Sequence, residues 1–235
     1  MEPSEHLYDT HFHLDLQKDQ FAAINEIEAH RIYTVAVTNL PDLYRRECAG
    51  IDSKFIRIGL GFHPELVHQY KSQIPLMWEL LPETRYIGEV GLDYVDTTYK
   101  NEQVKFFAEL IERCRNDEKK ILTIHSRRAV KEVLSIVGGD FKFKPILHWF
   151  TGNLTELKEA IEMGFYFSVN GAMMASKRFL EVLPLIPNNR ILLETDGPFT
   201  YCNGNHSNTL GNIAIGLKKE KPGLDLWQNF NDLLK

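Results

Sequence analysis

Two histidines separated by one residue, His11 and His13, lie in the apolar stretch YDTHFHLDL near the start of the sequence. Residues i and i+2 of a β-strand point to the same face, so Asp9, His11 and His13 share a face if this stretch is a strand. Two imidazoles placed in this way can bind one metal ion. The alternative is that both are polar residues on an exposed strand face, and the rest of the sequence has to decide.

A glutamate between two glycines is the next candidate. Glu89 lies in YIGEVGLDY, between Gly88 and Gly91. An ionised carboxylate in a protein interior is unfavourable unless it is paired or bound to a metal. Glu89 can therefore bridge two ions through its two oxygens, or it can pair with an interior arginine or lysine.

Three more potential ligands lie near the ends of later apolar stretches. His125 ends ILTIH, His148 lies in PILHW, and Asp196 lies in ILLETD. A lone histidine in such a position is more often a hydrogen-bonded core residue, whereas two on adjacent strands favour metal ligands. Asp196 could bind a metal and also accept a proton from a bound water. Glu89 and Asp196 are therefore our candidate catalytic residues.

Eight short apolar stretches, alternating with amphipathic segments of helical spacing, must position these residues. We expect strands at residues 7–13, 33–39, 55–62, 86–92, 121–125, 145–149, 165–169 and 191–196. This alternation predicts an α/β fold, a (β/α)8 TIM barrel in one domain spanning residues 1–235. An open doubly wound sheet is the alternative.

The barrel prediction places the candidate residues in one region, because the active site of a TIM barrel lies at the C-terminal ends of its strands. His11, His13 and Asp196 come from the adjoining first and eighth strands. His125 and His148 come from the fifth and sixth strands, and Glu89 could join the two sets. Imidazole with carboxylate suits Zn, Mn, Co or Ni, and a carboxylate-rich site with retained waters can take Mg. We expect two divalent ions, which together could activate a water for phosphoryl transfer.

Other polar and aromatic residues near the strand ends are weaker candidates. Arg127 could bind a phosphate bidentately or be a solvated arginine at a helix start, and His63 could hydrogen-bond a substrate oxygen or fix its own loop. Aromatic residues there could stack on a base or simply pack: Trp149, Phe150 and Tyr94. We expect Asp9 to orient a metal ligand by a hydrogen bond. Four histidines outside strand ends are interpreted as surface residues: His6, His30, His68 and His206.

Composition limits the function classes. A net charge of −5 over 235 residues argues against a protein that coats nucleic acid electrostatically, but not against a nuclease with a locally basic site. We see no signal peptide and no apolar run long enough to span a membrane. The cysteines are scattered and form no CxxC pair, which predicts a reducing, cytoplasmic setting: Cys48, Cys114 and Cys202.

The motifs together resemble a known family. DTHFHLD, GFHPE, IGEVGLDY, IHSRRA, LHWFTGN and LLETDGPF are similar, in the same order, to the signature motifs of the TatD-like metal-dependent deoxyribonucleases of the amidohydrolase superfamily. The resemblance implies a TIM barrel that hydrolyses DNA phosphodiester bonds with divalent metal. It assigns His11 and His13 as ligands and Glu89 as the bridging ligand. It also assigns His125 and His148 to the second ion, and Asp196 as the ligand that accepts a proton.

The chain departs from the family pattern beside two of these residues. Trp149 and Gly197 stand where the family usually has the cysteine of HCFTG and the serine of ETDSP. The proposed ligands are all retained, so the departures bear on substrate preference.

Several motifs also look like the TatD-like component of Qat anti-phage defence systems, which implies a bacterial protein that works with partner subunits. Two other functions remain open: hydrolysis of another ester or an amide on the same scaffold, and a metal-binding subunit that is active only with partner proteins.

Overall fold

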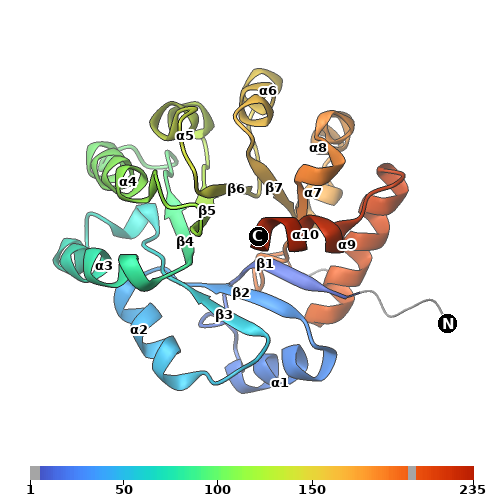
Figure 1. Ribbon diagram of the computed structural model, residues 1–235, viewed down its shortest axis with the longest axis horizontal. Coiled ribbons are helices and arrows are strands. Elements are labelled where there is room, and N and C mark those ends of the chain that lie inside the picture. The colour runs from blue at the N-terminus through green and yellow to red at the C-terminus, as the bar shows by residue number, and fades with distance from the viewer. Residues whose placement is uncertain (1–5, 201–204) are drawn as a thin grey trace. The chain divides into compact units, whose positions relative to one another are not determined.

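The computed structural model describes residues 6–200 and 205–235. In these residues the chain forms eight β-strands and ten α-helices in the predicted alternating order (Figure 1). The strands are β1 (Tyr8–Phe12), β2 (Tyr33–Val37), β3 (Ile56–Gly59), β4 (Tyr86–Gly91), β5 (Ile121–His125), β6 (Lys144–His148), β7 (Tyr166–Val169) and β8 (Ile191–Leu193). The helices are α1 (Gln20–His30), α2 (Pro41–Gly50), α3 (Ile74–Leu80), α4 (Lys100–Cys114), α5 (Val130–Val137), α6 (Leu154–Glu162), α7 (Gly171–Met174), α8 (Lys177–Val182), α9 (His206–Glu220) and α10 (Leu226–Leu234).

All eight predicted strands are confirmed, most of them slightly shorter than predicted. β1, β2 and β3 form one sheet, and β4 to β8 form a second sheet in sequence order. The register of β1 with β2, of β4 with β5 and of β5 with β6 is parallel. The predicted α/β class with parallel strands is therefore confirmed.

The chain divides into two compact units. Unit 1 consists of Met1–Ala36, Ile51–Arg57 and Ser168–Lys235, and unit 2 consists of Val37–Gly50 and Ile58–Phe167. The candidate metal ligands divide between the two units, and Glu89, which could join the two sets, falls in the same unit as His125 and His148. His11, His13 and Asp196 belong to unit 1, and Glu89, His125 and His148 belong to unit 2.

In unit 2, β5 is a mostly apolar segment that is interrupted only by Thr123. Ile121, Leu122 and Ile124 are almost completely buried, as expected for a parallel strand covered on both faces. Gly91 of β4 pairs with His125 of β5, and Ile124 pairs with Leu147 of β6. This register brings the last residues of β4, β5 and β6 to the same edge. Helix α5 packs against α4 and α6 (Figure 1).

In unit 1, β8 runs beside β1. The Thr10 hydroxyl donates to the carbonyl of Leu193 at 2.9 Å. Beyond the end of β8, the Asp196 N–H donates to the carbonyl of His11 at 2.9 Å, and the His13 N–H donates to the carbonyl of Gly197 at 3.0 Å. These three hydrogen bonds fix the alignment of the two segments that carry His11, His13 and Asp196.

The backbone conformation at position 91, the last residue of β4, requires a glycine. Its φ is +139°, and a Cβ added there would lie 2.0 Å from the carbonyl oxygen of His125. We expect Gly91→Ala to lower the free energy of unfolding by at least about 3 kcal/mol, because backbone strain and overlap add. Urea denaturation measures this.

Gly50→Ala is the control for this prediction. A Cβ at Gly50 would meet no atom within 4 Å, so a change below about 1 kcal/mol is expected. Equal stability of the two variants would contradict the claim that a side chain at position 91 strains the backbone and overlaps with His125.

Two further sequence predictions are answered here. No helix among the described residues is long and apolar enough to cross a membrane. Cys48 is exposed and Cys114 is buried, and both are free thiols, whereas Cys202 lies outside the described residues. Burial raises the pKa of the Cys114 thiol to about 12, so this cysteine is chemically inert at neutral pH.

Candidate metal centre

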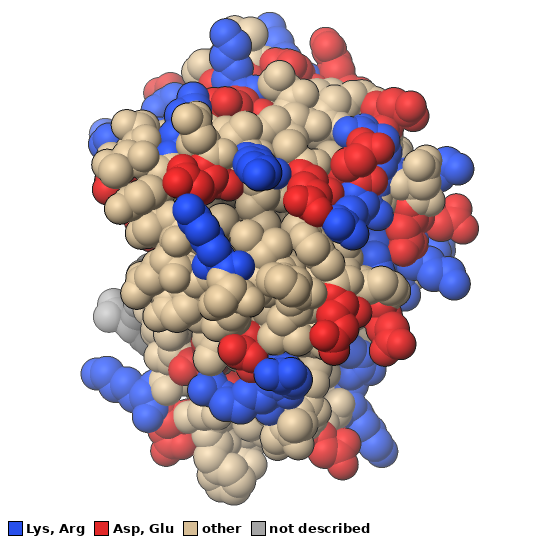
Figure 2. Space-filling model, turned by 90° about the vertical axis from the view of Figure 1, so that its left-hand side faces the viewer, with Lys and Arg blue, Asp and Glu red and all other residues tan. Residues whose placement is uncertain are grey.

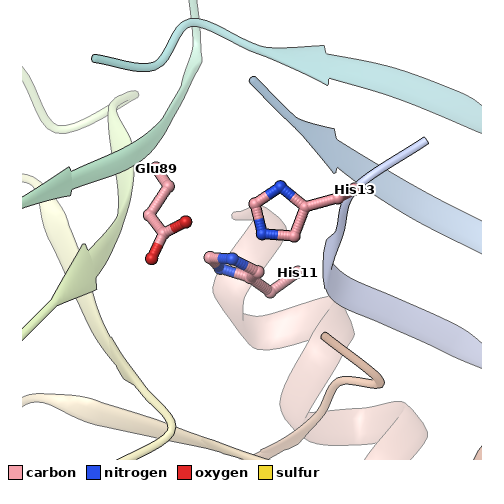
Figure 3. A group of neighbouring side chains, drawn as sticks. All are labelled: His11, His13 and Glu89. Atoms are coloured by element: carbon pink, nitrogen blue, oxygen red, sulfur yellow. The ribbon is translucent and has the colours of Figure 1, made fainter. Parts of the chain in front are cut away.

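Unit 1 brings His11, His13 and Asp196 together. The Asp196 Oδ1 lies 3.3 Å from the His13 Nε2 and 3.7 Å from the His11 Nε2. All three side chains are buried. The imidazole of His11, in β1, and that of His13, directly after β1, are neighbours with ring centroids 5.1 Å apart (Figure 3). Their proximity agrees with the first predicted set, and their role as ligands stays a prediction.

The conformation of Asp196 is set by the turn that follows β8. Its φ is +50°, in the left-handed region that non-glycine residues seldom adopt. The N–H of Phe199 donates to the carbonyl of Asp196 at 2.9 Å and closes the turn. A residue held in this region by its surroundings is a known feature of functional sites.

Asp9 orients backbone in this cluster. Its carboxylate accepts hydrogen bonds from the His11 N–H at 3.0 Å, the Thr195 N–H at 3.1 Å and the Thr195 hydroxyl at 2.5 Å. We expected Asp9 to orient a ligand by a hydrogen bond. The hydrogen bonds in the structure go to the main chain of His11 and to the residue before Asp196, so Asp9 aligns the two segments that carry the ligands.

The prediction that His206 is a surface residue is wrong. His206 is 2% exposed, its Nε2 donates to the Asp9 carboxylate at 2.8 Å, and its ring stacks on Phe12. His206 begins α9, far from Asp9 in the sequence, and the loop-like residues around it gave no signal of burial. The remaining three histidines of that prediction are exposed or partly exposed: His6, His30 and His68.

Unit 2 gathers three histidines around Glu89 of β4, which is also labelled in Figure 3. The Glu89 Oε1 lies 2.6 Å from the His125 Nδ1 and 3.0 Å from the His148 Nε2. It also lies 3.7 Å from the Nε2 of His63, which the sequence suggested as a substrate contact. His63, Glu89 and His125 each offer a ligand atom close enough to share one ion.

Asp93 is a member of this cluster that the sequence analysis missed. It is 2% exposed, and its Oδ2 lies 2.8 Å from the His125 Nε2. Its Oδ1 accepts the Val95 N–H, and its own N–H donates to the Gln103 side chain. Glu89, Gly91 and Asp93 alternate at i, i+2 and i+4, which is the spacing of one strand face. That spacing is a signal that could have identified Asp93.

His125 lies between the carboxylates of Glu89 and Asp93, and these two groups shift its pKa. Burial opposes the charged ring, but the Glu89 charge and the hydrogen bonds to Asp93 and Glu89 outweigh it, so the pKa of His125 is raised. Burial also raises the pKa of Asp93, but the hydrogen bonds from His125 and the Val95 N–H outweigh it, so the pKa of Asp93 is lowered. Both ring nitrogens face carboxylate oxygens, so a cation that binds His125 takes the place of one of these contacts.

The donor set of the two clusters fits divalent metal ions. Imidazole nitrogens and carboxylate oxygens converge in each unit, from buried side chains that a hydrophobic core does not require. This combination suits Zn, Mn, Co or Ni.

The remaining candidates lie around the clusters. Arg127 is exposed and lines a groove of about 380 Å³ with Arg128, Thr151 and Glu156. The charge of Arg127 helps to lower the pKa of Asp93, although hydrogen bonds contribute more. Phe150 is 4% exposed and packs against Phe167, which identifies it as a core residue.

Comparison with known proteins places this geometry in context. Residues 8–219 match the model of the family described as TatD related DNase. The "Uncharacterized metal-dependent hydrolase YabD" of Bacillus subtilis is 31% identical over 206 residues, covering 82% of this chain and 80% of that protein. The "3'-5' ssDNA/RNA exonuclease TatD" of Citrobacter rodentium is 34% identical over 149 residues, covering 59% of this chain and 56% of that protein.

Solved structures agree with the predicted fold. The YJJV TatD homolog from Escherichia coli superposes with a TM-score of 0.76 at 19% identity, covering 97% of this chain and 95% of that chain. A phosphotriesterase homology protein from Escherichia coli, complexed with phosphate in its active site, gives a TM-score of 0.64 at 16% identity and covers both chains fully. The prediction of a (β/α)8 TIM-barrel fold is confirmed, whereas its confinement to one domain stays a prediction.

Proposed function

Because this chain belongs to the family of TatD-related DNases, we propose that it is a divalent-metal-dependent nuclease that hydrolyses phosphodiester bonds in DNA. Membership makes it a metal-dependent hydrolase of phosphodiester bonds. The observation that supports assigning this activity to the chain is the surroundings of the Glu89 carboxylate. One of its oxygens lies within 3.7 Å of ring nitrogens of three histidines.

We assign the metal ligands by cluster. His11, His13 and Asp196 would hold one ion, His125 and His148 would hold a second, and Glu89 would bridge them. When bound, divalent ions at these residues would lower the pKa of a bound water and would offset negative charge on the phosphate. The number and identity of the ions are part of the proposal, with Mg, Mn, Zn, Co and Ni as the candidates.

The side chains have distinct roles in this mechanism. The Asp196 carboxylate accepts the proton that the attacking water loses. His63 donates a hydrogen bond to a phosphate oxygen, or contributes a further ligand beside Glu89. Arg127 at the adjoining groove donates to the phosphate from its guanidinium. Asp9 keeps the main chain of His11 and Thr195 aligned, which preserves the geometry of the first cluster.

Metal removal tests the proposal directly. Dialysis against EDTA is expected to reduce cleavage of single- and double-stranded DNA by more than about 100-fold, because loss of the ions removes several kcal/mol of transition-state stabilisation. Addition of Mn²⁺ or Mg²⁺ should restore it, as measured on a gel with labelled DNA. DNA cleavage that persists unchanged in EDTA would overturn the metal-dependent mechanism.

Activity measurements also distinguish this proposal from two alternatives, a hydrolase of other substrates and a subunit that is active only with partner proteins. Activity on amide or other ester substrates but not on DNA would indicate a different hydrolase on the same scaffold. We also propose, from the motifs shared with Qat systems, a role in anti-phage defence with partner subunits in the cytoplasm. Metal binding without cleavage, followed by cleavage when partner subunits are added, would support that role.

A further inference from the structure

Phe199 is an exposed aromatic residue beside the first cluster. Its side chain is 63% exposed, whereas His13 is 2% exposed. The two rings are perpendicular, with centroids 5.4 Å apart. Phe199 therefore places an apolar, solvent-facing ring in direct contact with a proposed metal ligand.

The backbone holds this ring in place. Phe199 lies in the turn after Asp196, and its N–H donates to the Asp196 carbonyl at 2.9 Å. The next residue, Thr200, is 6% exposed, and its hydroxyl donates to the carbonyl of Thr195. Hydrogen bonds on both sides of Phe199 thus anchor the turn. A side chain presented from an anchored turn loses little freedom when a ligand stacks on it.

The charge of the protein makes such a contact useful to a nuclease. The net charge is −5, and on the face in Figure 2 basic residues are interspersed with acidic ones. A net negative charge does not favour long-range attraction to phosphates, so contacts near the site carry more of the affinity for nucleic acid. Stacking of a base on an aromatic ring is such a contact, and every base offers a face for it.

We propose that Phe199 is a stacking platform for a nucleobase next to the phosphate that is cleaved. This inference rests on the proposed nuclease function and adds a base-binding subsite to it. A base inside a duplex is already stacked on both faces, so the subsite takes a base from a single strand or an unpaired end. Phe199 would contact the substrate through its ring and take no part in proton transfer.

The test compares two polymers of equal length and charge. One is oligothymidylate, and the other is an abasic tetrahydrofuran strand that keeps the phosphates and lacks the bases. We expect Phe199→Leu to lower kcat/KM on oligothymidylate by about 10-fold, mainly through KM, and to leave cleavage of the abasic strand unchanged. Phe199→Trp should retain cleavage of oligothymidylate.

Two controls isolate stacking from other effects. Phe21→Ala removes a phenylalanine of α1 that is 74% exposed, and it should change cleavage of neither polymer. Metal content measured by mass spectrometry should be the same in Phe199→Leu and the native protein. A loss of metal in Phe199→Leu would show that Phe199 acts by supporting His13, and it would overturn the stacking role.

A binding measurement avoids dependence on turnover. In the Glu89→Gln background, where we expect cleavage to be at least about 100-fold slower, the fluorescence of a strand containing 2-aminopurine can be read before the strand is cut, and stacking on Phe199 should quench it. Adding Phe199→Leu should reduce the quenching. Equal losses on both polymers, or quenching unaffected by Phe199→Leu, would refute the subsite and leave the nuclease function standing. If the native protein cleaves neither polymer, the proposed nuclease function of the isolated chain is refuted instead.

Discussion

Replacing Glu89 by glutamine is expected to reduce kcat/KM on DNA by at least about 100-fold and to lower the number of bound ions per chain. The amide keeps the size of the side chain but removes its negative charge and one acceptor oxygen. Glu89 is 3% exposed and lies against the nitrogens of His125 and His148, so solvent screens its charge little and the loss of that charge is felt at the site. Activity on labelled DNA and metal analysis by mass spectrometry provide the two measurements.

A glutamate outside the cluster supplies the control for this prediction. Glu83 is exposed on the same unit, and Glu83→Gln should retain both activity and metal content. Glu89→Gln should still fold, because it is isosteric and creates no cavity. Full DNase activity and unchanged metal content in folded Glu89→Gln would show that Glu89 binds no ion.

The strands could be predicted because their signal is local. Each is a short apolar run bordered by polar or glycine residues, and parallel strands that are buried on both faces keep such runs uninterrupted. His11, His13, His125 and His148 follow from the same signal, since each lies in such a run or at its end. Asp196 lies beyond the last residue of β8, so the sequence placed its strand end three residues too late.

The supporting residues were harder to predict because their partners are distant in the chain. The hydrogen bond between His206 and Asp9 joins residues that are 197 positions apart in the sequence. The residues next to His206 in the sequence do not indicate that its side chain is buried. The left-handed backbone conformation of Asp196 and Trp149 could not be predicted either, because glycine is the residue that usually indicates such a conformation in a sequence. Asp93 is different, since its spacing from Glu89 on one strand face was visible in the sequence.

Replacing Asp9 by alanine is expected to lower the free energy of unfolding by about 3–5 kcal/mol, the range for breaking a buried charged pair. The carboxylate is 0% exposed and accepts four hydrogen bonds, from the His11 N–H, the Thr195 N–H and hydroxyl, and the His206 ring. Alanine leaves all four buried donors without this acceptor, and each unsatisfied group costs about 1–3 kcal/mol before relaxation. Urea denaturation of the metal-free protein measures the loss.

Two further variants serve as comparisons for the loss of stability in Asp9→Ala. His206→Ala removes one of the four donors to the buried Asp9 carboxylate and leaves a cavity beside Phe12, so it should also lower the free energy of unfolding by several kcal/mol, about 3–5 kcal/mol. Asp19→Ala removes an exposed N-cap of α1 in the same unit, which should cost about 1 kcal/mol. A loss in Asp9→Ala no larger than that in Asp19→Ala would contradict the network.

The same network should affect metal affinity, because it aligns the main chain of His11 with that of Thr195, the neighbour of Asp196. Removal of an outer partner of a metal ligand typically lowers affinity by about 10–100-fold. Asp9→Asn, which can keep part of the hydrogen bonding, should bind Zn²⁺ more weakly than the native protein and more tightly than Asp9→Ala, as titration calorimetry would measure. Native affinity in a folded Asp9→Ala protein would mean that the three hydrogen bonds between the two segments, one from the Thr10 hydroxyl and two between backbone groups, align the ligands without Asp9.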